Sequence, residues 1–166
     1  MKEIWKDIKG YNGDYQISNF GRVMSFKNGR KRMLKNSFRD KNYYNISLWL
    51  NNKKSEYRIH NLVWSHFGDE ESNGHEKQVD HIDRNKLNNR IDNLRISNNA
   101  QNNINRTGYN KTSKYKGVCW FKRNSKWRAY IGGKHIGLFD TEKEAAIAYN
   151  TMATKIYGEF AYLNLF

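Results

Sequence analysis

The hydrophobic pattern of this chain changes twice along its length, and this limits the chain to small cores. Alternating apolar and polar segments flank a stretch, Val79 to Arg106, that is rich in Asn and poor in apolar side chains. Only 37% of the 166 residues are apolar, whereas 14% are aromatic. Because each large ring buries about 150–250 Å², we expect an α+β protein with several small aromatic cores.

The first 66 residues predict a small antiparallel sheet. Segments 15–18, 22–25 and 44–50 alternate apolar with polar residues, which buries one face of a sheet. Asn12-Gly13 provides a turn before them, and Phe20-Gly21 and Asn28-Gly29 provide turns between them. A short helix is expected over residues 60–67.

The middle stretch, residues 67–106, predicts two short strands and a helix. Val79–His81 and Leu94–Ile96 are the strand candidates, and Ser97 is expected to N-cap a helix over residues 98–106. Asn has low helix propensity, so this helix needs a tertiary reason to form, such as binding a metal.

Residues 107–114 resemble a linker in composition, and residues 115–166 predict a three-stranded sheet packed on one helix. The strands are expected at 115–121, 127–131 and 135–139, with Trp120 and Trp127 in the core. Thr141 and Glu144 form a capping box and Gly158 ends the helix. The predicted buried face of that helix consists of Ala145, Ala148, Tyr149, Met152 and Ile156.

The net charge of +14 and a pI near 9.8 favour a polyanionic partner, with nucleic acid the commonest. Both flanks are strongly basic, whereas residues 67–106 hold 6 basic and 7 acidic residues. The alternative is a basic protein with no such partner. A single cysteine, Cys119, excludes an intramolecular disulfide and a Cys-rich zinc ribbon. No signal-like or membrane-spanning run is present, so a cytosolic location is expected.

One set of polar side chains suits phosphodiester hydrolysis, which needs a cation and a base. Asp80 and Asn102 offer hard oxygen ligands suited to Mg²⁺, with Mn²⁺ as the alternative. His81 can accept a proton near neutral pH. Asn93 is expected to orient the imidazole by a hydrogen bond.

These residues carry a resemblance to a known family. Asp80-His81, Asn85, Asn88-Asn89, Asn93-Leu94-Arg95 and Asn102 resemble the ββα-metal motif of HNH endonucleases, in the variant that ends in Asn. Residues 4–11, 15–19 and 21–23 resemble the module that precedes this core in phage and intron-encoded homing endonucleases. Residues 115–118, 137–139 and 144–149 resemble an AP2-type DNA-binding domain.

The resemblance implies that Asp80 and Asn102 bind one divalent metal, that His81 is the general base and that Asn93 positions it. It also implies a monomeric, site-specific endonuclease that acts on double-stranded DNA and nicks one strand. A phage or mobile element would encode it, it would act in the bacterial cytosol, and no protein partner is implied.

The basic flanks supply the candidate DNA contacts. In the predicted sheet region, 1–66, these are Arg22, Lys27, Arg30, Lys31, Arg32 and Lys35. In the predicted AP2-like region, 115–166, they are Lys116, Lys122, Arg123, Lys126, Arg128, Tyr130, Lys134 and His135. Two rival interpretations stay open: a non-catalytic DNA-binding regulator with a degenerate HNH core, and an RNA-binding or RNA-cleaving protein.

Overall fold

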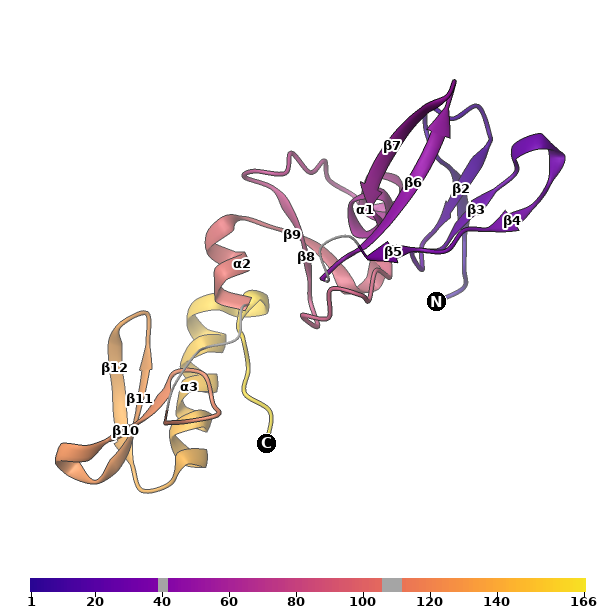
Figure 1. Cartoon of the computed structure of the whole chain (residues 1–166). Coiled ribbons are helices and arrows are strands. Elements are labelled where there is room, and N and C mark those ends of the chain that lie inside the picture. Colours follow the sequence, from indigo (N-terminus) through magenta and orange to yellow (C-terminus); the bar gives the residue numbers. More distant parts are fainter. Residues whose placement is uncertain (39–41, 106–111) are drawn as a thin grey trace. The chain divides into compact units, whose positions relative to one another are not determined.

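The computed structural model describes residues 1–38, 42–105 and 112–166 (Figure 1). It divides the chain into two compact units, Met1–Asn99 (unit 1) and Ala100–Phe166 (unit 2). Most of the predicted linker, 107–114, and residue 106 at the predicted helix end lie outside the described residues. Among the described helices, none has the length and apolarity required to cross a membrane.

Unit 1 contains three small antiparallel sheets and the helix α1 (Ile59–Phe67). The first sheet has the order β1 (Trp5–Asp7), β2 (Tyr15–Ser18), β3 (Val23–Ser25), β4 (Arg32–Met33). The second consists of β5 (Ser37–Phe38), β6 (Tyr44–Leu50) and β7 (Lys53–Arg58). The third is a two-stranded ribbon of β8 (Gln78–His81) and β9 (Leu94–Ser97). The 3₁₀ turn η2 (Ile91–Asn93) lies directly before β9.

One hydrophobic core holds all of unit 1 together. Ile17 and Leu48 from the first two sheets and Val63 from α1 are fully buried, and Leu94 from β9 belongs to the same cluster. The predicted modules 1–66 and 67–106 therefore share a core, and the boundary between them falls inside α1. The compact division lies at residues 99 and 100 instead. A two-stranded ribbon buries too little apolar surface to be stable alone, which explains why β8 and β9 pack against the earlier segments.

Unit 2 contains the predicted three-stranded sheet, in the order β10 (Val118–Phe121), β11 (Lys126–Ile131), β12 (Lys134–Phe139). The helix α3 (Glu142–Tyr157) lies along one face of it (Figure 1). Val118 and Ala129 pack there against Ala145 and Ala146. The capping box of Thr141 and Glu144 is present, and Gly158 ends the helix as predicted.

Some details of the predicted elements are wrong. Ile156 is 50% exposed, and Ala146 and Ala153 are buried instead, because the helix is rotated relative to the expected face. Trp120 is also exposed at 38%, since it lies at the strand end and contacts Trp127 only edge-on, at 5.2 Å between ring centroids.

The predicted cap of the middle helix is also wrong. The helix α2 runs over Asn99–Asn105, and Ser97 is the last residue of β9. The Ser97 hydroxyl is buried and has no hydrogen-bond partner in the described part of the chain, so it does not cap α2. The residue directly before the helix is Asn98, and cap residues of this type accept from the first free amides of a helix.

Thr141→Ala is expected to destabilise unit 2 by about 1 kcal/mol, because it removes the acceptor for the Glu144 amide. Hydrogen exchange of α3 amides in the full chain measures the change. Thr151→Ala is the control, since its hydroxyl bonds only within the helix, to the Ile147 carbonyl. Equal effects of the two substitutions would contradict the capping role.

Candidate active site

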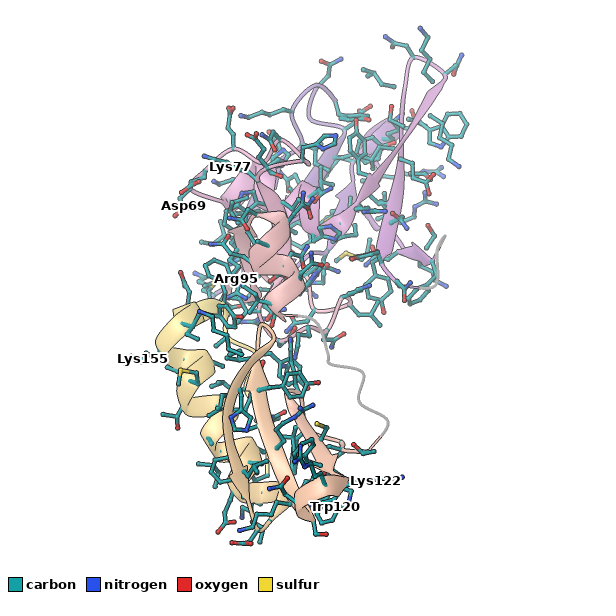
Figure 2. All side chains as sticks on the ribbon, turned by 90° about the vertical axis from the view of Figure 1, so that its left-hand side faces the viewer. Asp69, Lys77, Arg95, Trp120, Lys122 and Lys155 are labelled. Carbon is teal, nitrogen blue, oxygen red and sulfur yellow. The ribbon has the colours of Figure 1, made fainter. Side chains whose placement is uncertain are left out.

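Asp80 lies near the end of β8 and pairs with a cation from the neighbouring strand. The strand register places Asp80 directly opposite Arg95, which is labelled in Figure 2. Nη2 and Nε of Arg95 lie 3.2 Å and 3.4 Å from the Asp80 Oδ2. The two side chains are only 11% and 12% exposed. A buried carboxylate requires a partner of opposite charge, and Arg95 supplies it.

His81 follows at the strand end and is 4% exposed. Its Nε2 lies 3.1 Å from the Oδ1 of Asn89, and the His60 ring stands edge-on at 5.1 Å between centroids. Burial lowers the pKa of His81 below its ordinary value of 6.5 and outweighs Asn89 and Asp80, which would raise it. The imidazole is therefore neutral at physiological pH, which is the form that accepts a proton.

Asn93 does not make the predicted hydrogen bond to His81. Its Nδ2 donates to the Asp83 Oδ1 at 2.9 Å and to the Asn88 carbonyl at 2.8 Å, while its Oδ1 accepts from the Asp83 amide. All of its amide groups are thus engaged in the loop that follows β8. Burial alone would raise the pKa of Asp83, but hydrogen bonds from Asn88 and Asn93 outweigh it and lower that pKa.

Asn102 is half-buried on α2 and belongs to unit 2, whereas Asp80 belongs to unit 1. Within the described ranges, no three His, Cys, Asp or Glu side chains gather as a metal-binding group would. A lone carboxylate and an amide oxygen still fit Mg²⁺, which keeps several waters and takes few protein ligands. The ion pair of Asp80 shows that its carboxylate accommodates a cation.

The candidate DNA contacts of unit 1 divide into two groups. Arg22 is paired with Glu3, and the Nζ of Lys27 donates to the Trp49 carbonyl at 2.6 Å. These two side chains therefore also hold the fold together. The others lie exposed between β3 and β5 and are open to a polyanion: Arg30, Lys31, Arg32 and Lys35.

In unit 2 the sheet face opposite α3 carries Arg128 among aromatic rings. Its guanidinium lies 5.1 Å from the Phe121 ring and 5.6 Å from the Tyr130 ring, and Nη2 lies 3.4 Å from the Cys119 Sγ. Lys116 donates to the Ile104 carbonyl, and Lys126 pairs with Asp140. The remaining candidates are exposed: Lys122, Arg123, Lys134 and His135.

Two residues that contact the Asp80–His81 pair had no predicted role in the site. These residues, Arg95 and Asn89, lie within the HNH-like motif, but the motif alone assigns no function to them. Antiparallel pairing of the two predicted strands along their whole length would place Arg95 opposite Asp80, because each is the middle residue of a three-residue strand. No sequence signal identifies Asn89 as the partner of His81, since that contact arises in an irregular loop.

Arg95→Met is expected to destabilise unit 1 by about 3 kcal/mol in metal-free buffer, because it removes the neutralising cation from a buried carboxylate. Urea denaturation with hydrogen exchange at unit 1 amides measures this. Arg90→Met is the matched control: its pair with Asp92 has side chains that are 40% and 41% exposed, so the loss of stability should be much smaller. A larger loss for Arg90→Met would contradict the explanation.

Known proteins are similar to part of the chain. The chain is 44% identical over 93 residues to the DNA endonuclease I-HmuI of Bacillus phage SP01, which covers 55% of this chain and 50% of the relative. It is 35% identical over 88 residues to Protein 3.8 of Escherichia phage T7, covering 50% and 72%. A solved structure of the HNH homing endonuclease I-HmuI, described for DNA binding and cleavage, matches with a TM-score of 0.54 and 41% identity, covering 60% and 55%. The chain spans about half the length of I-HmuI.

Family models divide the matched part in two. A NUMOD4 motif matches residues 3–49, and an HNH endonuclease model matches residues 57–104, which include Asp80, His81, Asn93 and Asn102. Both matches end before the sheet and helix of unit 2. With the buried Asp80–His81 pair at the strand end, they show that the chain belongs to the HNH endonuclease family and carries an N-terminal NUMOD4 motif.

Proposed function

We propose that this protein is a site-specific DNA endonuclease of the homing type that hydrolyses a phosphodiester bond. The observation that carries the proposal is the buried Asp80–His81 pair, a carboxylate beside an imidazole whose pKa is lowered. I-HmuI, a relative over half its length, is a DNA endonuclease, which supports DNA as the substrate.

In this mechanism Asp80 and Asn102 would each supply an oxygen ligand to a divalent metal, Mg²⁺ or Mn²⁺. When bound, the ion neutralises charge that develops on the scissile phosphate. His81, neutral through its burial, takes the proton from the attacking water. Asn93 holds the loop between β8 and η2 and supports the site in that way. Arg95 neutralises the Asp80 carboxylate from the neighbouring strand.

DNA binding is assigned to two basic surfaces. One is the exposed segment Arg30–Lys35 of unit 1, and the other is the free sheet face of unit 2 with Arg128 between two aromatic rings. Arg and aromatic side chains on a sheet suit contacts with phosphates and bases. We assign unit 2 to the AP2-like domains on this basis and on its three-stranded sheet with one helix. The protein acts as a monomer in the cytosol of a bacterial host.

His81→Ala is expected to lower the cleavage rate by about 10²–10⁴-fold, because it removes the general base, and Asp80→Asn should abolish metal-dependent cleavage. The substrate is a supercoiled plasmid that carries the two DNA sequences flanking the gene, joined directly without the gene between them. Cleavage is followed in Mg²⁺ and, separately, in EDTA. One metal site cuts one strand per binding event, so open circles should accumulate before linear DNA.

His75→Ala and Asp92→Asn are the controls, since both side chains are exposed and lie outside the site. Undiminished cleavage by the Asp80 and His81 variants would favour a different nuclease centre. DNA binding without cleavage by the wild type would favour the rival DNA-binding regulator, and preference for structured RNA would favour the RNA interpretation.

The cleavage rate is expected to rise with pH and to reach its plateau by about pH 7. The neutral imidazole of His81 is the active form, and burial lowers its pKa below 6.5, so activity is lost only when the pH falls below that value. Single-turnover rates between pH 5 and 8 measure the profile. A midpoint above 6.5 would contradict the neutral, buried base.

A further inference from the structure

Asn89 determines which nitrogen of His81 carries the proton. Its Nδ2 donates to the Leu87 carbonyl at 3.2 Å, which fixes the orientation of the amide and turns Oδ1 toward His81. Oδ1 can only accept a hydrogen bond, so the Nε2 of His81, 3.1 Å away, must be the protonated nitrogen. Nδ1 is then the unprotonated nitrogen of the ring, the one that acts as acceptor.

Asn89 is itself held by the turn between β2 and β3. The Asn19 carbonyl accepts from the Ile91 amide at 2.9 Å, and the Phe20 ring lies 4.2 Å from the Arg90 guanidinium. Gly21 faces Asn89 so closely that a Cβ there would lie 2.9 Å from the Asn89 Cβ. Three consecutive residues of the turn thus contact residues 91, 90 and 89 in reverse order.

The turn is built to keep this position. The Ser18 hydroxyl accepts from the amides of Phe20 and Arg22, at 3.2 Å and 3.1 Å, and Gly21 has a φ of +79°, a conformation that favours glycine. The side chain of Asn19 accepts from the Ile4 amide at 2.8 Å and donates to the Lys2 carbonyl at 3.0 Å. Asn19 and Asn89 are 2% and 4% exposed.

We propose that Asn89 is a positioning residue for His81 and that the turn Ser18–Arg22 of the NUMOD4 region holds Asn89 in place. The N-terminal region then contributes to the chemistry of the site in addition to any contact with DNA. This inference rests on the proposed role of His81 as general base.

Asn89→Leu is expected to release the Nε2–H tautomer of His81 and to lower the single-turnover cleavage rate about tenfold or more at unchanged DNA affinity. Long-range ¹H–¹⁵N NMR of the histidine rings reads the tautomer directly and without cleavage. Asn89→Asp keeps an acceptor oxygen at the same position but adds a charge that raises the pKa of His81, so it should retain the Nε2–H tautomer and recover most of the rate at a pH above that pKa. If Asn89 only stabilised the fold, Asn89→Leu and Asn89→Asp would not differ in the tautomer of His81.

Gly21→Ala tests the contact with the turn, and Gly13→Ala is its matched control. The two glycines have nearly the same φ, +79° and +80°, but an added Cβ meets nothing within 4 Å at Gly13. Both variants therefore carry similar backbone strain, and only the added Cβ of Gly21→Ala meets close neighbours, the Asn89 Cβ at 2.9 Å and the Ile59 Cγ2 at 3.1 Å. We expect Gly21→Ala to change the His81 tautomer signal and to slow cleavage, with Gly13→Ala like the wild type.

The outcomes separate this inference from the proposed function. Wild-type cleavage by His81→Ala would overturn the general-base role itself. If His81 proves essential while Asn89→Leu and Gly21→Ala leave both tautomer and rate unchanged, only the positioning role is overturned. Should Asn89→Leu fail to fold, the comparison of Gly21→Ala with Gly13→Ala decides, since equal effects of these two would also overturn it.

Discussion

A two-stranded ribbon cannot bury a charged side chain by itself, and this constraint governs the whole of unit 1. The ribbon of β8 and β9 carries Asp80 and His81, yet contributes only Leu94 as a buried residue to the core, with Val79 and Ile96 packed against it. The N-terminal sheets and α1 supply the remaining apolar cover. Burial of the pair, and with it the neutral state of His81, therefore depends on residues far earlier in the chain.

The sequence predicts the elements whose periodicity is strong. Alternation in residues 44–50 corresponds to β6, and the capping box at Thr141 marks the start of α3 correctly. Periodicity predicts the buried face of a helix less well, as the exposed Ile156 shows, because the rotation of α3 on the sheet decides which of its residues are buried. The sequence also does not show that residues 1–66 and 67–106 share one core. An amphipathic pattern indicates that a face is buried but does not identify the element against which it packs.

The site was predictable as a set of residues and only partly as a geometry. Asp80 and His81 follow from their position at a strand end, and the structure places them there. The partner of His81 is Asn89 and not Asn93, because the loop after β8 folds back through hydrogen bonds between side chains and backbone. Such contacts depend on the exact course of an irregular segment, which neither spacing nor propensity specifies.

The pairing of Asp80 with Arg95 also determines how unit 1 keeps a charge in its interior. An internal guanidinium neutralises the buried carboxylate, so the burial of Asp80 does not require a bound ion, in contrast to small domains that fold only with their metal. Unit 1 can therefore keep this acid buried in a cell that offers few divalent ions.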